Sequence, residues 1–230
     1  MEINVQKLYT LTGHKDCVYN LEAGTSDNIF YSAAGDGMVV EWDLKNPETG
    51  KQIVRMKNSV YALHFLEGPQ CLVIGQNFEG IHIISTDKYC EQGSLRISNI
   101  QIFDIKSYGE NIFIGSGDGT LYIVDFSCRS FIKKIKLSDK SVRCIAINEK
   151  LGEMALGISD NTIRILDLKD FSQKYRINAH KLSVFSVTYN PLNNHLISTS
   201  RDAHIKSWNS LEHYKIEHSI PAHMFAINSL

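Results

Sequence analysis

The 230-residue sequence has few of the features that mark secreted, membrane-spanning or helical proteins. It contains four prolines, and no stretch approaches the ~18 consecutive apolar residues that a membrane-spanning helix needs. Its five cysteines are an odd number without a Cys-x-x-Cys pair, which argues against a disulfide framework or a zinc site. The net charge of −1 gives no general attraction to nucleic acids or anionic membranes. The N-terminus has no apolar run of the signal-peptide type, so we expect a cytoplasmic protein.

The sequence does contain a repeat. Trp42-Asp43 returns as Trp208-Asn209, and fainter copies stand between them at Ile84-Ser85, Val124-Asp125 and Leu166-Asp167. The steps between these pairs are 42, 40, 42 and 42 residues. A period of ~40–45 residues that ends in a Trp-Asp pair is typical of a four-stranded propeller blade. Helical periodicity is absent, so the sequence predicts an all-β protein.

Each period divides into short alternating runs separated by turn residues, which predicts small antiparallel strands. In the first repeat the predicted strands are 18–23, 29–34, 38–43 and 51–56, with Val18, Leu21 and Ala23 facing the core. The first strands of the later repeats are predicted at 60–65, 100–105, 142–147 and 184–189. In all five first strands the first, fourth and sixth residues are apolar. This spacing departs from strict alternation by one residue and therefore predicts a β-bulge.

Two repeats share a set of polar residues at matching offsets. The first repeat has Gly13-His14, Ser32, Asp36 and Trp42-Asp43, and the fifth has Ala179-His180, Ser198, Asp202 and Trp208-Asn209. In these residues the sequence resembles the WD-repeat β-propeller family. The resemblance implies a hydrogen-bonded chain from Trp to Ser to His to Asp within a blade, in which every buried polar group is satisfied. We therefore interpret His14 and His180 as structural residues and not as catalytic bases.

The three middle repeats keep less of this polar set. Repeats three and four retain Asp118 and Asp160, but repeat four has Ser138 in place of the histidine. Repeat two has Phe78 and Ile84 at the matching places. We expect these three blades to depend on apolar packing alone.

Two further patterns suggest ligand sites but do not fit them. His213, His218 and His223 are five residues apart, so on a strand they would alternate between faces and could not converge on one metal ion. The run from Gly115 to Gly119 is a turn between strands and not a strand-to-helix phosphate loop. No Gly-x-Ser-x-Gly nucleophile motif is present. We therefore expect no metal, no cofactor and no catalytic residue.

The whole chain is predicted to be one domain, residues 1–230. The expected repeats are about 14–56, 57–98, 99–137, 138–179 and 180–222, with a partial repeat at 223–230 and an N-terminal strand at 5–11. A seven-bladed ring with this period needs about 290 residues. We therefore expect an all-β β-propeller of four-stranded antiparallel blades, with five complete repeats and the start of a sixth, as a C-terminally incomplete seven-bladed ring. Uncovered blade faces would favour self-association or a partner that covers them.

Recognition residues of such a fold stand on the loops and at the strand ends near one face. The second residues of the five first strands occupy one equivalent place there, namely Tyr19, Tyr61, Gln101, Arg143 and Phe185. Aromatic residues and arginine are enriched in binding hot spots, and Lys181 and Arg201 lie in neighbouring loops. The prediction is a non-enzymatic scaffold that binds proteins or peptides, with no role in membrane or nucleic-acid binding. The alternatives are that these residues only line the channel, or that the propeller is an enzyme or binds a small ligand at its central channel.

Overall fold

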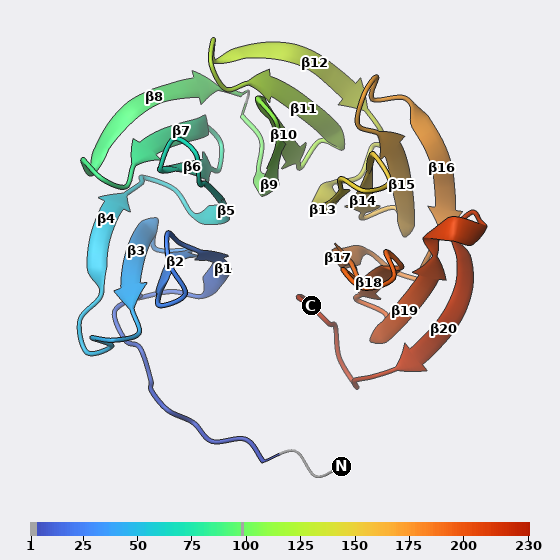
Figure 1. Cartoon of the computed structure of the whole chain (residues 1–230), viewed down its shortest axis with the longest axis horizontal. Helices are drawn as coiled ribbons and strands as arrows, with labels where there is room; N and C mark the ends of the chain where they lie inside the picture. Colours follow the sequence, from blue (N-terminus) through green and yellow to red (C-terminus); the bar gives the residue numbers. More distant parts are fainter. Residues whose placement is uncertain (1–3, 98) are drawn as a thin grey trace. The chain divides into compact units, whose positions relative to one another are not determined.

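The computed structural model of the chain describes residues 4–97 and 99–230. These residues form the strands β1 to β20, arranged as five antiparallel sheets of four consecutive strands each (Figure 1). We number the sheets 1 to 5 in chain order. The prediction of an all-β protein with four strands per repeat is confirmed. Within the described ranges, no helix is long and apolar enough to cross a lipid bilayer.

The chain divides into two compact units, Met1–Ser98 and Asn99–Leu230, which are described separately. The first unit contains sheets 1 and 2. Its strands are β1 (Val18–Ala23), β2 (Ile29–Ala34), β3 (Met38–Asp43), β4 (Lys51–Arg55), β5 (Val60–Leu66), β6 (Cys71–Gln76), β7 (Gly80–Ser85) and β8 (Cys90–Arg96). The predicted strands of the first repeat are confirmed, with β4 ending one residue earlier than predicted.

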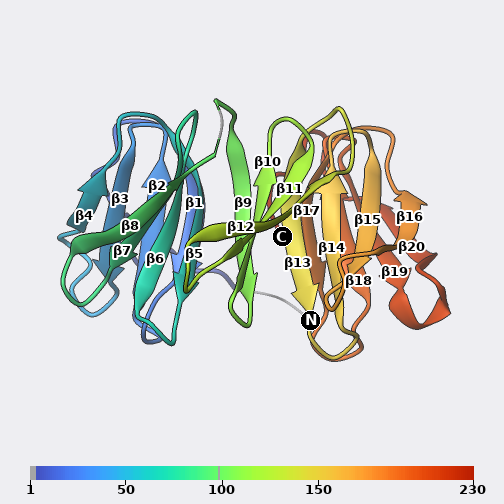
Figure 2. The ribbon, with the colours of Figure 1, turned by 90° about the horizontal axis from the view of Figure 1, so that it is seen from above.

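The second unit contains sheets 3, 4 and 5. Its strands are β9 (Ile102–Tyr108), β10 (Asn111–Ser116), β11 (Thr120–Asp125), β12 (Ser130–Lys136), β13 (Val142–Asn148), β14 (Glu153–Ile158), β15 (Thr162–Asp167), β16 (Gln173–Asn178), β17 (Val184–Tyr189), β18 (Leu196–Ser200), β19 (His204–Asn209) and β20 (Lys215–Pro221). The 3-10 turn η1 (Ser210–Glu212) connects the last two strands. Within each unit the strands run between two edges at which the connecting loops gather (Figure 2).

The turns between second and third strands need backbone conformations that few side chains tolerate. Gly37 and Gly119 have φ values of 76° and 80° there. A Cβ at Gly37 would lie 2.4 Å from the carbonyl oxygen of Met56, and one at Gly119 would lie 2.1 Å from that of Ser138. Glycine therefore avoids both backbone strain and crowding at these two turns, whereas Asn161 and Ala203 adopt φ values of 73° and 65° at the equivalent turns of sheets 4 and 5.

The first strand of every sheet pairs with the second through a shifted register, so that one residue is left out of the pairing. The predicted β-bulge is thus confirmed in all five sheets. The residues left out, which we call the bulge residues, are Tyr19, Tyr61, Phe103, Arg143 and Phe185.

The predicted position of the first strand of sheet 3 is wrong by two residues. The strand β9 begins at Ile102 and not at Ile100. The N–H of Gly117 donates to the carbonyl oxygen of Gln101 at 2.8 Å, as the N–H of Gly35 donates to that of Cys17, so Gln101 precedes the strand. The physical reason is the hairpin between β9 and β10. It pairs Tyr108 with Asn111 and therefore has two connecting residues, whereas the corresponding hairpins of sheets 2 and 4 have four.

Apolar side chains form a core between neighbouring sheets within each unit. In the first unit Tyr31, Ala33 and Val39 of sheet 1 cluster with Val60 and Leu63 of sheet 2. Equivalent clusters join sheets 3 and 4 and sheets 4 and 5. Full burial of one such aliphatic side chain contributes about 1.5–3 kcal/mol. The cores between sheets therefore supply much of the stability of each unit.

Two sequence expectations about sheet 1 and its surroundings differ from the structure. Val18, Leu21 and Ala23 are exposed, although they were expected to face the core. Residues 4–13 lie outside any strand, in contrast to the strand expected at 5–11. A strand needs a paired neighbour for its N–H and C=O groups, and none of the five described sheets includes these residues.

Candidate binding surface

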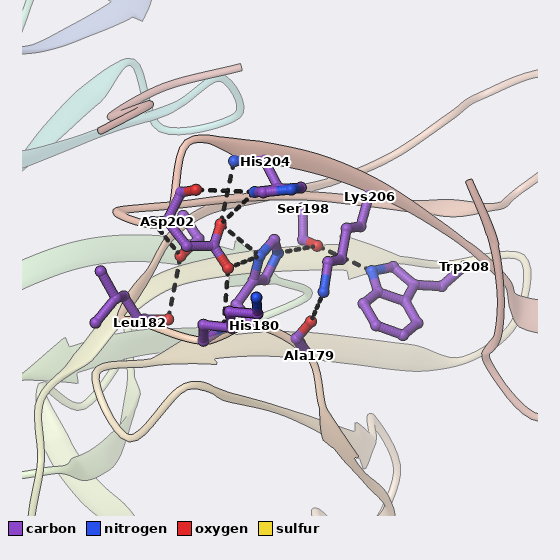
Figure 3. Close-up of polar contacts among 10 residues, drawn as sticks. Ala179, His180, Leu182, Ser198, Asp202, His204, Lys206 and Trp208 are labelled. Carbon is purple, nitrogen blue, oxygen red and sulfur yellow. Dashed lines mark hydrogen bonds and ion pairs between the residues drawn. The ribbon is translucent and has the colours of Figure 1, made fainter. Parts of the chain in front are cut away.

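Four side chains of sheet 5 form a continuous hydrogen-bonded chain, which we call a polar clamp (Figure 3). The indole Nε1 of Trp208 donates to Ser198 Oγ at 2.9 Å, and Ser198 Oγ lies 2.9 Å from His180 Nε2. His180 Nδ1 lies 3.1 Å from the carboxylate of Asp202. Since Trp208 can only donate, the Ser198 hydroxyl donates its own proton to His180 Nε2, and we assign the histidine proton to Nδ1. The chain implied by the family resemblance is confirmed in this sheet.

The environment of the clamp keeps His180 neutral and Asp202 ionised. Burial lowers the pKa of His180 to about 4, despite the nearby Asp202 carboxylate, which raises it. Burial also raises the pKa of Asp202. The backbone N–H groups of Lys181 and His204 and the His180 ring outweigh that effect, so this pKa lies below its usual value. The His180 side chain is inaccessible to solvent. It therefore positions the loop before β17 and has no contact with a substrate-accessible space.

Sheet 1 has the same clamp. Trp42 Nε1 donates to Ser32 Oγ at 2.8 Å, and Ser32 Oγ lies 2.7 Å from His14 Nε2. His14 Nδ1 lies 3.3 Å from Asp36, which also accepts the N–H of Lys15 at 2.7 Å. The two clamps therefore fix the corresponding loops of sheets 1 and 5.

The expectation that the middle sheets depend on packing alone is wrong for sheets 3 and 4. In sheet 4, Asp160 accepts from Ser138 Oγ at 2.9 Å and from an Arg164 guanidinium nitrogen at 3.1 Å. In sheet 3, Asp118 accepts from Ser116 Oγ at 2.6 Å and from Tyr122 OH at 3.3 Å. The signal for these replacements is in the sequence, because Arg164 and Tyr122 each stand four residues after the aspartate that they contact.

The bulge residues contact one another within each unit. In the second unit the Arg143 guanidinium carbon lies 4.0 Å from the ring centroid of Phe103 and 5.0 Å from that of Phe185. In the first unit the rings of Tyr19 and Tyr61 meet edge to face with centroids 4.5 Å apart. Each cation–π contact contributes about 0.5–2 kcal/mol. The equivalent positions of successive sheets therefore form a continuous surface in each unit.

Of the five site residues predicted at the second position of the first strands, four are bulge residues and Gln101 is not. Phe103 takes the place that was predicted for Gln101. The sequence signal that could have identified Phe103 is the short turn at Gly109-Glu110, where Gly109 has a φ of 58°. Compared with the other repeats, this turn shortens the segment from the bulge residue to Val124 by two residues.

Lys181 and Arg201 lie in loops near the bulge residue of sheet 5, Phe185. Both are exposed. The N–H of Lys181 donates to Asp202 at 2.9 Å, and the N–H of Arg201 donates to the carbonyl oxygen of Ser183 at 3.0 Å. These bonds hold both loops beside the start of β17. We call the set Phe103, Arg143, Lys181, Phe185 and Arg201 the cation–aromatic face.

A second polar network joins sheets 4 and 5 away from the bulges. Tyr214 OH donates to Glu153 at 2.5 Å, and Tyr189 OH lies 2.9 Å from Tyr214 OH. Lys174 Nζ lies 2.6 Å from the other oxygen of Glu153. Burial raises the pKa of both Tyr189 and Tyr214, so both hydroxyls stay protonated and can donate.

We expect Tyr214→Phe to lower the free energy of unfolding by about 1–2 kcal/mol, because it removes a buried bond to a charged acceptor. Tyr175→Phe is the matched control, since its hydroxyl bonds to His213 at an exposed position. That control should change stability by less than about 0.5 kcal/mol. Equal losses for the two variants in urea unfolding would contradict this role of the network.

The comparisons with known proteins agree with this architecture. A family described as WD domain, G-beta repeat matches residues 5–43 and 171–209, the regions that contain both polar clamps. The chain is 20% identical over 206 residues to a 66 kDa stress protein of Physarum polycephalum, covering 86% of this chain and 33% of that protein. It is 22% identical over 224 residues to THO complex subunit 3 of Arabidopsis thaliana, covering 96% of this chain and 70% of that protein. It is 30% identical over 74 residues to a THO complex subunit 6 homolog of Danio rerio, covering 32% of this chain and 23% of that protein.

A solved structure extends the likeness to the fold. The crystal structure of the computationally designed Ika8 protein matches with a TM-score of 0.78 at 18% identity, covering 96% of this chain and 66% of that one. The chain thus spans about a third of the stress protein and about two thirds of the designed protein. The repeat period, the five four-stranded sheets and the two clamps agree with the match of residues 5–43 and 171–209 to the WD40 repeat family.

Proposed function

We propose that this chain is a non-enzymatic scaffold that binds other proteins or peptides through the cation–aromatic face. The observation that carries the proposal is the position of Arg143 between the rings of Phe103 and Phe185. Arginine and large aromatic side chains held rigidly at a strand end are the types that dominate binding energy at protein interfaces. The contact with two rings also reduces the side-chain entropy that Arg143 would lose on binding.

Other features favour binding over catalysis. The histidine and aspartate pairs of the clamps bond to each other and to Ser198 or Ser32, so their polar atoms are used within the fold. Among residues 4–97 and 99–230, no three His, Cys, Asp or Glu side chains are grouped so that they could hold a metal ion. Two of the relatives are named as subunits of a complex. These points support membership of a protein assembly for this chain as well.

Tyr19 and Tyr61 form an aromatic pair at the equivalent positions of the first unit, and we propose the same role for them. A cytoplasmic location stays a prediction from the cysteine pattern and the N-terminal residues.

The test compares affinity capture by the tagged chain and by a triple variant, Phe103→Ala, Arg143→Ala and Phe185→Ala. We expect partners bound at this face to be recovered at least about tenfold less, which corresponds to a loss of about 1.4 kcal/mol in binding. The melting temperature should fall by only about 2–4 °C per lost kcal/mol, so the variant stays folded.

Two controls make the result specific. Leu192→Ala with Leu211→Ala changes exposed apolar residues at the end of sheet 5 opposite to its bulge, and should leave capture unchanged. Gln101→Ala changes the residue that precedes β9, and should have little effect if the observed register defines the surface. Unchanged capture by a stably folded triple variant would refute the proposal.

A further inference from the structure

Neighbouring sheets of one unit contact through two complementary faces. The first face presents the first and fourth residues of a first strand, and we call it the leading face. In sheet 2 these residues are Val60 and Leu63, each 0% exposed. They cluster with Tyr31, Ala33 and Val39 on the trailing face of sheet 1, which is formed by its second and third strands.

The trailing faces of sheets 3 and 4 have a slot that receives the first leading residue of the next sheet. At Gly157 of sheet 4, an added Cβ would lie 2.8 Å from Val184 Cγ1 of sheet 5. At Gly115 of sheet 3, it would lie 3.1 Å from Val142 Cγ1 of sheet 4. The β-branched residue of the next sheet therefore fills space that a small residue leaves open.

The leading face of sheet 1 is uncovered. Val18 is 49% exposed and Leu21 is 66% exposed, whereas the equivalent residues of sheet 2 are fully buried. Both side chains are apolar, so their exposure loses burial energy that the other sheets gain. The leading face of sheet 1 therefore has the apolar residues that contact a trailing face in the other sheets, but no such contact.

The trailing face of sheet 5 is only partly covered. Ile205 is half-buried and its partner Ile220 is 55% exposed, whereas the equivalent residues of sheet 4 are the fully buried Ile163 and the half-buried Ile177. The N–H of Ile227 donates to the carbonyl oxygen of Ser200 at 3.2 Å, and Ile227 is 8% exposed. Ile227 follows His223 by four residues, as Val184 follows His180. Thr199 stands in sheet 5 where sheet 4 has Gly157, so Ile227 lies beside a larger residue, while the rest of this face stays open.

We infer that the leading face of sheet 1 in one copy of the chain docks onto the trailing face of sheet 5 in a second copy. The argument is complementarity, because one chain carries both halves of the contact that joins its own sheets. In the docked pair Leu21 would cover Ile205 and Ile220, and Val18 would displace Ile227 from its place beside Ser200. Such a contact uses two different surfaces, so it is heterologous and can continue from copy to copy.

The test uses the full chain and one variant for each face. Leu21→Arg places a charge on the leading face, and Ile220→Arg places one on the trailing face. Light scattering during size exclusion should show that the wild-type mass rises above the 26.0 kDa chain mass as concentration increases, and that each variant alone stays at the chain mass. An equimolar mixture of the two variants retains one intact pair of faces. It should therefore form a complex of two chains and no larger species.

Leu192→Arg is the control, because Leu192 is an exposed loop residue outside both faces. It should associate as the wild type does. Circular dichroism melting of each variant shows whether it is folded, and the exposure of Leu21 and Ile220 predicts that it is. A wild-type chain that remains monomeric at ~100 µM, far above the micromolar range of specific association, would overturn the inference. So would a mixture of the two folded variants that forms no complex.

Discussion

Replacing Trp208 with alanine should lower the free energy of unfolding by about 3–5 kcal/mol, the range for truncation of a large buried aromatic side chain. Trp208 is almost fully buried and belongs to the core between sheets 4 and 5. Its removal leaves a cavity there and takes away the N–H that Ser198 Oγ accepts. Both losses act on the same core, so this single change should be among the most destabilising in the chain.

Trp208→Phe separates the two contributions. It keeps most of the apolar volume and removes the indole N–H, so we expect a loss of about 1–2 kcal/mol. Leu211→Ala, at a mostly exposed position, should change stability by less than about 0.5 kcal/mol. Urea unfolding at neutral pH measures all three. If Trp208→Ala lost no more than the Leu211 control, the clamp would not be the structural element described.

The protonation of His180 alone should lower the free energy of unfolding by about 3 kcal/mol as the pH falls from 7 to 4. Burial lowers the pKa of this histidine to about 4 in the folded chain, below the value of about 6.5 in the unfolded chain. Between these two pH values the unfolded chain therefore binds more protons than the folded chain. The stabilisation is fully present above pH 6.5 and is lost as the pH falls through this window.

The measurement is a series of urea unfolding curves between pH 7 and pH 4.5 for the wild type and for His180→Gln. The glutamine does not titrate, so the wild type should lose its advantage over the variant as the pH falls. Other titrating groups contribute to both proteins and cancel in the difference. A stability difference that stays constant across this range would show that His180 takes up its proton equally well in the folded chain.

The strand pattern could be predicted closely because it depends on local features. In the first repeat, apolar and polar residues alternate in the segment from Val18 to Asp43, and Asp36-Gly37 form a turn. These two features predict the bounds of β1 to β3, and the structure has the same bounds. The clamps could also be predicted from the sequence, because Ser32 and Ser198 recur at matching offsets from their tryptophans. Such features need no knowledge of what lies across the sheet.

The features that sequence reasoning missed depend on neighbours or on hairpin length. The slip at Phe103 is two residues, and a shift of two keeps every side chain on its original face, so apolar alternation could not detect it. The exposure of Val18 and Leu21 depends on whether another sheet covers them, which their own pattern does not encode. The contact of Arg164 with Asp160 required knowing that a cation four residues later can reach the aspartate where Ser138 replaces the histidine of the clamp.

The most direct test of the proposed binding surface is backbone amide hydrogen exchange of the chain alone and with a partner that is recovered by the wild type and lost by the triple variant. The bulge residues are left out of the strand pairing, so their amides report directly on contacts at this surface. The account predicts added protection at Phe103, Arg143 and Phe185 and in the loop at residues 180–183, with no change in the outer strands β12, β16 and β20. Protection confined to those outer strands, with unchanged exchange at the bulges, would contradict it.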